Sequence, residues 1–370
     1  MTAGVAHVLT SPGNGGVPRV VRALVSRIDR RRYEPSVFFL KPGEGLDVFR
    51  DLDATVEMAS IARGKTGAIA ALAEFLAAQR VAILHTHSFR PNLYGRMAGA
   101  LLRADGLRIV AHYHNDYADK WADPSAIALE RRLGRITDAR IAVSNAVAGH
   151  VADWTGADED SVSVIRNGLD LDRLVSADRA RGRAALGLGE GHVCICLVGR
   201  ICAQKGVDVF IDAAESLLSD LPQARFVVLG VTEDKALSAR LRARAEAAPR
   251  QAIRLLGHRE DLGDLLAGCD ILAAPSRWEG FGLAVVEGMA MGLPVVASAV
   301  GGLPEVTQGA AYLIPPDDPA SLAAALRRLV DNPPLRAEYG RAARLRSATF
   351  DWAKTADAVE RLYDRILAGP

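Results

Sequence analysis

The chain has 370 residues, which is long enough for two domains of ordinary size. Hydrophobic residues make up 49% and charged residues 24%, a composition that predicts packed cores and argues against a disordered chain. With 45 basic and 44 acidic residues, the chain lacks the strong basic excess of a dedicated nucleic-acid binder.

Two features of the sequence bear on the compartment. The segment Met1–Thr10 has the pattern of a strand and not of a signal peptide, and no apolar run approaches the ~20 residues of a membrane span. Cys194 and Cys196 alternate within an apolar strand-like run, while Cys202 and Cys269 stand alone. This pattern favours buried thiols in a reducing cytosol over a metal site, so we expect a cytoplasmic protein.

Short β-branched segments alternate with longer amphipathic segments along the first half of the chain. Such alternation predicts parallel strands joined by helical crossovers. The expected strands are Ala6–Thr10, Ser36–Leu40, Ile83–Thr86, Ile109–His112, Arg140–Val143 and Val162–Ile165. The expected helices lie near Val17–Ile28, Ile69–Gln79, Asn92–Leu102 and Asn145–Asp153.

The pattern breaks after Asp172. The stretch Arg173–Gly191 is polar, charged and interrupted by glycine, which predicts an interdomain connection. The alternation then begins again, with expected strands at Val193–Val198, Arg225–Leu229, Ile253–Leu256, Ile271–Ala274, Val295–Ala297 and Tyr312–Ile314. The expected helices are Val207–Leu218, Leu237–Ala247, Leu283–Met291 and Ala320–Val330.

The last segment, Asp351–Leu367, has the pattern of one helix with Asp351 as its N-cap. Its apolar residues recur at steps of four and three and so share one face: Trp352, Ala356, Val359, Tyr363 and Ile366. We predict an α/β protein with two Rossmann-like domains, at 1–175 and 190–350, that face a central cleft. The helix at 351–370 is expected to pack back on the N-terminal domain. Ligands of such sheets lie at the carboxyl ends of the strands.

A pair of cations follows the first strand of the second domain. Arg200 and Lys205 lie five residues apart in the loop Gly199–Gly206, which ends where a helix is expected. An arginine fork and a lysine charge can bind one diphosphate together. Two unrelated surface charges explain the loop equally well, because a lone Arg and Lys are a weak signal.

A stronger signal lies in the segment Pro275–Leu283, between an expected strand and an expected helix. Glycines at 280 and 282 allow close approach of a ligand to the backbone, and the following helix N-terminus favours a phosphate. Glu279 lies in this loop, and Glu287 lies eight positions later in the helix. Carboxylates beside a phosphate site make sense if they accept hydrogen bonds from sugar hydroxyls. The structural alternative is a helix-surface charge and a partner of the helix dipole.

These motifs resemble those of retaining glycosyltransferases with the GT-B fold. Glu279 and Glu287 match the E-x7-E motif, and the surrounding sequence resembles glycosyltransferase family 4. The resemblance covers nearly the whole chain in the expected order. Its further matches are Asn14-Gly15-Gly16-Val17, Ile165-Arg166-Asn167-Gly168-Leu169-Asp170, Gly199-Arg200 with Lys205-Gly206, and Ala299-Val300-Gly301-Gly302-Leu303-Pro304-Glu305.

The resemblance implies roles for the residues of the second domain. Arg200 and Lys205 would bind the donor diphosphate, and Glu287 would bind the ribose hydroxyls. Glu279 would contact the transferred sugar. The implied amide donors to sugar and phosphate are Phe281, Gly282 and Leu283, and His258 would lie near the nucleobase.

In the first domain, the loop Gly13–Gly16 follows the first expected strand without completing a dinucleotide-binding glycine pattern. The resemblance places Gly15 and Gly16 beside the reacting sugar. The family often carries an acid near position 18, where this chain has Pro18.

Four histidines gather at two strand ends. His85 and His87 end one expected strand, and His112 and His114 end another. A structural role is the usual one for a single histidine, and no cysteine or spaced acid set completes a recognisable metal pattern. By resemblance, His114 matches a family histidine near the donor sugar and acceptor and is a candidate catalytic residue. His87 is a weaker candidate.

Two D-x-D pairs occur, at Asp51–Asp53 and Asp170–Asp172. Turn and cap chemistry explains them better than a metal site. Because Arg200 and Lys205 can neutralise the diphosphate, we expect no metal requirement and no cofactor other than the donor.

Six arginines lie on and after the first expected helix: Arg19, Arg22, Arg27, Arg30, Arg31 and Arg32. Most such clusters are solvated surfaces. A basic amphipathic surface can also bind anionic lipid, so peripheral contact with the inner face of a membrane is an open hypothesis.

The sequence therefore predicts an enzyme that transfers a sugar, with retention, from a UDP- or GDP-linked donor to a glycan, lipid-linked or small-molecule acceptor. Three alternatives stay open. They are a sugar-nucleotide epimerase or hydrolase of similar shape, a Rossmann oxidoreductase, and a noncatalytic nucleotide-sugar binding protein. The incomplete first glycine loop argues against the oxidoreductase.

Overall fold

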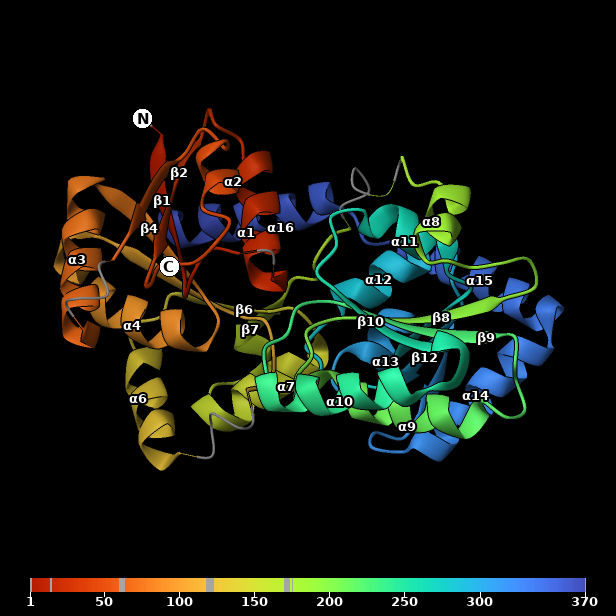
Figure 1. Ribbon diagram of the computed structural model, residues 1–370. Helices are drawn as coiled ribbons and strands as arrows, with labels where there is room; N and C mark the ends of the chain where they lie inside the picture. The colour runs from red at the N-terminus through yellow and green to blue at the C-terminus, as the bar shows by residue number, and fades with distance from the viewer. Residues whose placement is uncertain are drawn as a thin grey trace. The chain divides into compact units, whose positions relative to one another are not determined.

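The chain folds into two compact α/β units, each built around a parallel sheet (Figure 1). The computed structural model describes residues 2–13, 15–59, 64–117, 123–169, 174 and 176–369. Unit 1 comprises Met1–Gly168 together with Asp351–Pro370, and unit 2 comprises Leu169–Phe350. The predicted fold class, with two Rossmann-like parallel sheets, is confirmed.

Unit 1 contains a seven-stranded sheet in the order β3-β2-β1-β4-β5-β6-β7. The chain order reverses direction between β1 and β4, which makes the ends of these strands a topological switch point. The strands are β1 (Ala3–Leu9), β2 (Tyr33–Phe39), β3 (Thr55–Met58), β4 (Val81–His87), β5 (Arg108–Tyr113), β6 (Ala139–Ala142) and β7 (Val162–Val164).

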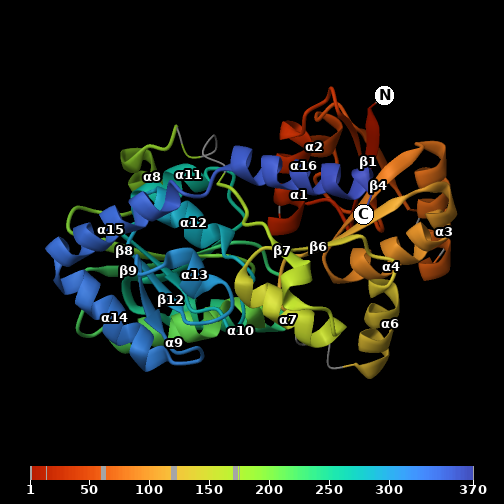
Figure 2. The same ribbon diagram turned by 180° about the vertical axis from the view of Figure 1, so that it is seen from behind.

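Helices lie on both faces of this sheet. They are α1 (Gly16–Arg27), α2 (Asp47–Arg50), α3 (Gly64–Ala78), α4 (Phe89–Ala100), α6 (Pro124–Gly134), α7 (Asn145–Thr155) and α16 (Trp352–Ala368). Leu9, Val37 and Phe39 pack with α1 on one face, and Val8, Phe38 and Leu84 pack with α3 on the other. Helix α1 also packs against α16, which Figure 2 shows lying alongside it.

The C-terminal helix forms as its sequence pattern predicts. The Asp351 carboxylate accepts a hydrogen bond of 2.8 Å from the amide of Ala353, which satisfies one N–H of the first turn. All five residues of the predicted apolar face are buried. Glu360 and Asp364, on the same helix, form ion pairs with Arg32. Helix α16 is therefore part of unit 1, as predicted.

Unit 2 contains a six-stranded sheet in the order β10-β9-β8-β11-β12-β13. This is the doubly wound order, with its switch point between β8 and β11. The strands are β8 (Val193–Val198), β9 (Ala224–Leu229), β10 (Ile253–Gly257), β11 (Ile271–Ala274), β12 (Val295–Ser298) and β13 (Ala311–Ile314).

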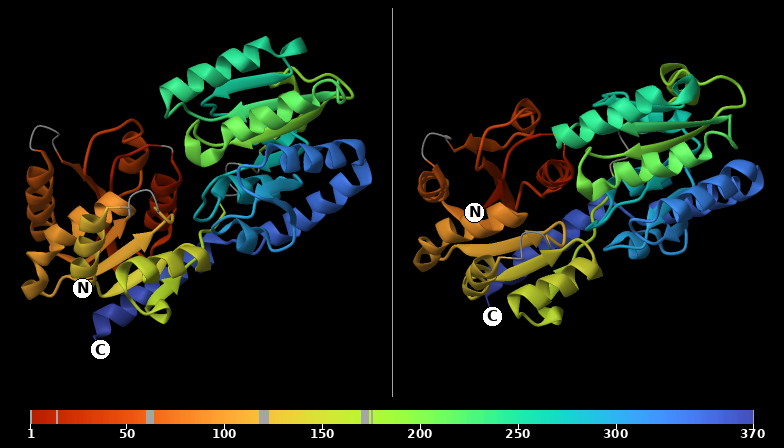
Figure 3. Two further views of the ribbon diagram at one scale, coloured as in Figure 1. Left: turned by 90° about the horizontal axis from the view of Figure 1, so that it is seen from below. Right: turned by 60° about the horizontal axis from the view of Figure 1, so that its bottom comes forward.

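The helices of unit 2 also cover both faces of its sheet (Figure 3). They are α8 (Arg179–Ala185), α9 (Val207–Leu217), α10 (Lys235–Ala247), α11 (Leu262–Gly268), α12 (Leu283–Ala290), α13 (Leu303–Thr307), α14 (Pro319–Asp331) and α15 (Pro333–Ser347). Helices α9, α10 and α14 contribute to one core with Ile195, Phe226 and Val296. Helix α12 packs against α15, and α8 packs against α11.

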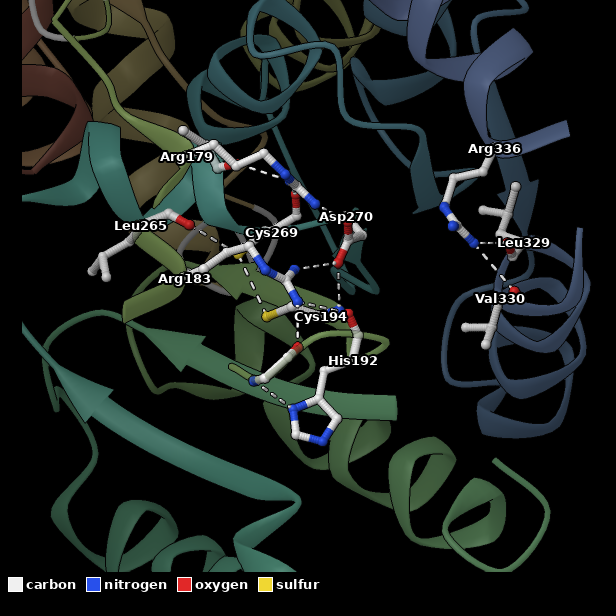
Figure 4. A network of polar contacts seen from close by, with 12 residues as sticks. Arg179, Arg183, His192, Cys194, Leu265, Cys269, Asp270, Leu329, Val330 and Arg336 are labelled. Atoms are coloured by element: carbon white, nitrogen blue, oxygen red, sulfur yellow. Dashed lines mark hydrogen bonds and ion pairs between the residues drawn. The ribbon is translucent and has the colours of Figure 1, made fainter. Parts of the chain in front are cut away.

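The predicted connection Arg173–Gly191 contains a helix of unit 2. Arg179 and Arg183 of α8 both form ion pairs with Asp270, which directly precedes β11 (Figure 4). The Asp270 carboxylate also accepts a hydrogen bond of 2.8 Å from the amide of Cys194 at the start of β8. Helix α8 carries three arginines, so its polar sequence shows no clear apolar period. Two of these arginines attach the helix to the rest of unit 2 through Asp270.

Several other elements, most of them short, were not predicted. These are β3, α2, α6, α11, α13 and α15. Helix α15 has charged residues on most of its length, and α13 has only five residues, so neither shows a clear apolar period. The strand and helix boundaries that were predicted differ from the structure by a few residues at most of their ends.

Cys194, Cys196 and Cys269 are buried, as the sequence predicts, and Cys202 is partly exposed. The sulfur atoms of Cys194 and Cys269 lie 3.7 Å apart, and this contact together with burial raises the pKa of the Cys194 thiol. Across the described parts of the chain, no helix combines the length and the apolar character that crossing a bilayer requires.

A buried ion pair joins α4 to α6 in unit 1. The side chains of Arg96 and Glu130 form this pair with no exposed surface. The Tyr113 hydroxyl donates a hydrogen bond of 2.5 Å to the other Glu130 oxygen, and Arg96 donates one of 3.2 Å to Thr137. The pair therefore has the additional polar partners that a charge needs away from water.

We expect Glu130→Ala to lower the free energy of unfolding by about 3–5 kcal/mol, because it leaves the Arg96 charge buried without its carboxylate. Denaturant unfolding followed by circular dichroism measures the change. The double variant Arg96→Met/Glu130→Leu removes both charges and should lose less stability than the single variant. A double variant as unstable as Glu130→Ala would contradict this account.

Candidate functional site

The candidate site of unit 2 lies at the carboxyl ends of β8 and β11, where the strand order reverses. A pocket there is lined by residues of both strands and of the loops that follow them. Its lining consists of Leu197, Val198, Lys205, Leu272, Ala273, Ala274, Ser276, Glu279, Gly282, Ala284 and Val285. Open parallel sheets bind ligands at this position. Three predicted site residues, Lys205, Glu279 and Gly282, line the same pocket.

The loop between β8 and α9 approaches the loop after β11 at Gly206. Gly206 has a φ of 60°, and a Cβ atom there would lie 2.0 Å from the carbonyl oxygen of Pro275. Only glycine fits both the left-handed conformation and this contact. The preceding residues, Ala203–Lys205, form one 3-10 turn that carries Lys205 toward the pocket.

Lys205 and Glu279 form an ion pair that joins the two loops. The lysine Nζ contacts Glu279 Oε2, and the two side chains are 18% and 13% exposed. The sequence predicted both as site residues without predicting that they touch. The pair holds a cation beside the pocket and neutralises it with a carboxylate that faces the same space.

Arg200 lies at the outer side of this arrangement. Its guanidinium pairs with Glu233 and donates a hydrogen bond of 2.9 Å to Oε1 of Gln204. The Gln204 amide in turn donates one of 3.1 Å to the carbonyl of Trp278. Arg200 is therefore connected to the loop after β11, although it is absent from the pocket lining.

The backbone of Glu279 is held by the Gly301-Gly302 motif. Gly301 has a φ of 50°, and a Cβ atom there would lie 2.0 Å from the Glu279 carbonyl oxygen. The Gly302 amide donates a hydrogen bond of 2.9 Å to the same oxygen. This second glycine motif therefore positions the acidic loop.

Helix α12 begins directly at the pocket. Gly282 is its N-cap, with a left-handed φ of 87° and no side-chain capping bond. The first N–H groups of a helix have no partner within the helix and carry its positive dipole end. The start of α12 can therefore present amide donors to an anionic ligand in the pocket.

The remaining predicted residues of unit 2 lie farther from the pocket surface. Phe281 is buried and its ring packs edge-on against Phe350, so only its backbone is suited to a ligand. Glu287 is 3% exposed on α12 and lies outside the pocket lining, as does Leu283. His258 is exposed, directly after β10.

Arg277 and Asp208 join the same two loops, and the sequence analysis assigned them no role. Arg277 donates two hydrogen bonds to Asp208, of 3.0 and 2.9 Å, and two more to the carbonyls of Ala203 and Gln204. Burial raises the pKa of the Asp208 carboxyl, but the Arg277 hydrogen bonds and charge outweigh this effect and lower it below its usual value. The signal available in the sequence was a charged residue inside one motif, Arg277, and another just after the other motif, Asp208.

In unit 1, Gly15 and Gly16 lie where β1 leads into α1. Gly15 is the N-cap of α1, and Pro18 lies in its first turn. Backbone N–H groups of a first turn have no acceptor within the helix, so the N–H that proline lacks costs no helical hydrogen bond. Asn14 of the predicted motif lies outside the described residues, as do Asp170 and Asp172. Asp51 and Asp53 follow α2 at its C-terminal end.

The predicted histidines lie close together at the ends of β4 and β5, with His7 of β1 beside them. The Nδ1 atom of His87 lies 3.1 Å from Nε2 of His114. Burial lowers the pKa of His114 to about 3, and it lowers that of His87 well below its usual value. Both imidazoles are therefore neutral at pH 7, and His114 can take part in hydrogen bonds but does not act as a cation.

The six arginines near α1 are largely used within unit 1. Arg31 pairs with Asp29, and Arg32 pairs with Glu360 and Asp364. Arg30 donates hydrogen bonds to the carbonyls of Val25, Leu52 and Asp53. Carboxylates of unit 1 therefore pair with at least two of the six arginines, Arg31 and Arg32, whereas Arg30 keeps its charge.

Two doubly wound parallel-sheet units in one chain define the GT-B class. The sequence-family model described as Glycosyltransferase Family 4 matches residues 14–173, and the one described as Glycosyl transferases group 1 matches residues 192–332. Together the two glycosyltransferase models cover most of the chain, in agreement with the resemblance of its motifs to glycosyltransferase family 4.

Individual proteins are similar over different shares of the chain. A D-inositol 3-phosphate glycosyltransferase of Streptomyces scabiei is 33% identical over 259 residues, which cover 66% of this chain and 58% of that relative. Anabaena HepE, solved with UDP and glucose, has a TM-score of 0.87 at 21% identity and covers 98% of this chain and 100% of its own. Sucrose-phosphate synthase of Thermosynechococcus elongatus has a TM-score of 0.83 at 20% identity, with full coverage of both chains.

We expect Asp208→Asn to lower the free energy of unfolding at pH 7 by about 1–2 kcal/mol, because it removes the charge from a bidentate, three-quarters-buried contact. Since the folded-state pKa of Asp208 is depressed, its contribution is present above the unfolded value of about 4 and is lost as the pH falls through the folded value. The difference in the free energy of unfolding between wild type and variant should thus persist from pH 7 to 5 and shrink below about pH 4.

The matched control is Asp212→Asn on the same helix. Asp212 pairs with Arg244 at a more exposed position, and each arginine keeps a second carboxylate, Glu215 for Arg244 and Asp317 for Arg277, so the two variants differ mainly in burial. Exposed pairs contribute little, so this variant should stay close to wild type. Equal losses for both variants would show that the Arg277 contact has no special role.

Proposed function

We propose that this protein is a retaining glycosyltransferase that uses a nucleotide-diphosphate sugar as donor. The observation that carries the proposal is the ion pair of Lys205 and Glu279 at the switch-point pocket, beside the N-terminus of α12. The Lys205 charge and the N-terminus of α12 suit a diphosphate, and the Glu279 carboxylate suits the hydroxyls of a sugar. The matches to two glycosyltransferase family models support the same reaction.

The pocket residues can stabilise the charge that develops in transfer. Breaking the bond from the anomeric carbon to the diphosphate leaves negative charge on the leaving phosphate. Lys205, Arg200 and the first amides of α12 are the proposed donors to that charge, so electrostatic stabilisation supplies the largest contribution. When Lys205 turns from Glu279 to the phosphate, the Glu279 carboxylate becomes available to the hydroxyls of the transferred sugar.

The remaining roles follow the family resemblance. Glu287 is proposed to bind the ribose and His258 the nucleobase, with Phe281, Gly282 and Leu283 as amide donors. In unit 1, we propose that His114, Gly15 and Gly16 serve the sugar and the acceptor. Retention is proposed to proceed by front-face attack without a protein nucleophile, and no metal is required at the diphosphate.

UDP is the proposed donor nucleotide, with GDP as the other candidate. The structure of Anabaena HepE contains UDP and glucose, which supports a uridine donor for a chain of the same fold. The acceptor is proposed to be a hydroxyl of a glycan, a lipid-linked sugar or a small polyol phosphate. The last of these follows the name of the Streptomyces relative.

A thermal-shift screen of UDP-, GDP- and ADP-sugars tests the donor. At equal ligand concentration, a ligand that binds the native state more tightly raises its stability further, so the true donor should give the largest shift. Transfer is then measured with acceptor extracts. Release of nucleotide without any acceptor would indicate a hydrolase, and binding without turnover would indicate a noncatalytic protein.

We expect Lys205→Ala and Arg200→Ala each to weaken UDP binding about 10- to 100-fold, because each removes a charge-assisted contact to the diphosphate. Calorimetric titration with UDP measures the loss. Arg240→Ala, an exposed arginine on α10, is the control and should bind as wild type does. Unchanged affinity in both site variants would exclude the proposed diphosphate site.

The variant Glu279→Gln distinguishes contacts to the sugar from contacts to the nucleotide. Because its carboxylate is proposed to contact the sugar, the variant should keep its affinity for UDP and lose the extra affinity for the UDP-sugar. The two titrations are compared on the same preparation. A parallel loss for both ligands would instead assign Glu279 to the orientation of Lys205 alone.

Peripheral membrane contact through the Arg19–Arg32 region is a separate proposal. Arg27 is exposed at the end of α1, where it donates to the carbonyl of Ala23 and the hydroxyl of Ser26. We expect flotation with anionic vesicles that falls with salt and with Arg27→Glu, and is unaffected by Arg240→Glu. Absence of flotation, or flotation that ignores salt, would remove the proposal.

A further inference from the structure

Five histidines form one cluster on a single face of the unit 1 sheet. His7 lies on β1, His85 and His87 on β4, and His112 on β5, and His114 follows directly after. In the parallel register His7 lies beside His85, and His87 lies beside His112. Side chains at alternate positions of a strand share a face, so the register gathers the imidazoles together.

The rings of this histidine cluster are packed against one another. The ring centroids of His112 and His114 lie 4.0 Å apart, those of His85 and His87 lie 4.2 Å apart, and those of His87 and His112 lie 5.3 Å apart. Four of the five histidines are essentially without exposed surface, and His114 is partly exposed. Five polar rings are thus concentrated on a buried face of the sheet, a position that apolar side chains usually occupy.

Hydrogen bonds account for only part of this polarity. The central ring, His87, has Nε2 at 3.0 Å from His7 Nδ1 and Nδ1 at 3.1 Å from His114 Nε2. Among the described residues, however, both ring nitrogens of His112 are buried without a hydrogen-bond partner. A buried polar atom without a partner is costly and calls for an explanation, of which an unseen ion is one.

We propose that His87, His112 and His114 bind a transition-metal ion that prefers imidazole ligands, such as Zn²⁺. One nitrogen from each ring lies within 4.8 Å of the others, so the three rings can converge on one ion. Three imidazoles with a fourth position for water form a recognised type of zinc site. Burial keeps the rings neutral, which is the form that coordinates a metal.

The neighbouring trio His7, His85 and His87 is the weaker candidate. All three side chains are buried. Nδ1 of His85 lies 2.5 Å from the Tyr363 hydroxyl, so this nitrogen already has a hydrogen-bond partner. The proposed trio includes the partly exposed His114, which offers a path for the ion. His7 then acts as the outer partner that orients the His87 ring, the usual arrangement around metal-bound histidine.

This site differs from a metal on the donor diphosphate, which the sequence analysis did not expect. The sequence places all three histidines at the ends of two strands, without a cysteine or spaced acids to complete a metal pattern, and the strand register brings the three imidazoles together. The proposal concerns binding alone and does not rest on the proposed transferase function. A metal bound at one ring nitrogen of His114 would leave the other ring nitrogen for the sugar, to which the proposed function assigns this residue.

The test uses the full chain, freed of affinity tag and of metal by chelator dialysis. Zn²⁺ is titrated in competition with a chromophoric chelator, and Co²⁺ is added separately to observe its visible absorption. We expect about one ion per chain and the intense visible bands of a tetrahedral Co²⁺ site. Absence of saturable binding, or an octahedral Co²⁺ spectrum like that of the free ion, would overturn the proposal.

Three variants locate the site. His112→Phe replaces the imidazole with an apolar aromatic ring and removes two buried nitrogens that have no hydrogen-bond partner, so the variant should fold. Because it lacks a metal ligand, it should lose Zn²⁺ binding. His114→Ala tests the partly exposed ligand, should the first variant fail to fold. His7→Phe removes only the outer partner and should weaken binding about 10- to 100-fold.

The control is His150→Phe, a half-exposed histidine on α7 outside the cluster, which should leave binding unchanged. Affinity retained in both His112→Phe and His114→Ala would place the ion elsewhere and refute the assignment.

Discussion

The ion pair between Lys205 and Glu279 is the contact on which the candidate site depends. It joins loops that follow two different strands, and it forms because both loops leave the sheet at the point where the strand order reverses. The close approach at Gly206 and the Arg277–Asp208 contact hold the same loops together from the other side. A charged pair in this position can exchange its internal partner for a ligand without rearrangement of the core.

The two sheets place polar residues at their switch points in different ways. In unit 2 the strand ends carry charged residues on loops, with a helix N-terminus beside them. In unit 1 the corresponding strands, β1 and β4, bring histidines into the buried face itself, and β5 adds His112. Partly exposed charges on loops suit a ligand that binds and leaves, whereas buried neutral imidazoles suit a permanently bound partner.

The contacts around the site also explain why its motifs contain so many glycines. Gly206 and Gly301 each have positive φ and each lie against a carbonyl of a loop that follows β11. The first contact sets the distance between the two loops, and the second holds the backbone of Glu279. These glycines therefore act through the position of the charged residues and not through the ligand.

The sequence by itself determined the parallel α/β class, most of the strands and longer helices, the C-terminal helix of unit 1 and the two motifs of the pocket. These follow from local periodicity and from short segments, which need no knowledge of distant residues. It missed α8 and α15, whose charged surfaces conceal a helical period.

Only the tertiary structure decided which residues touch: Lys205 with Glu279, Arg277 with Asp208, and His87 with both His7 and His114. It also showed that Glu287 and the ring of Phe281 are buried. Each of these contacts joins segments far apart in the chain, and strand order and register, which no local pattern specifies, bring them together.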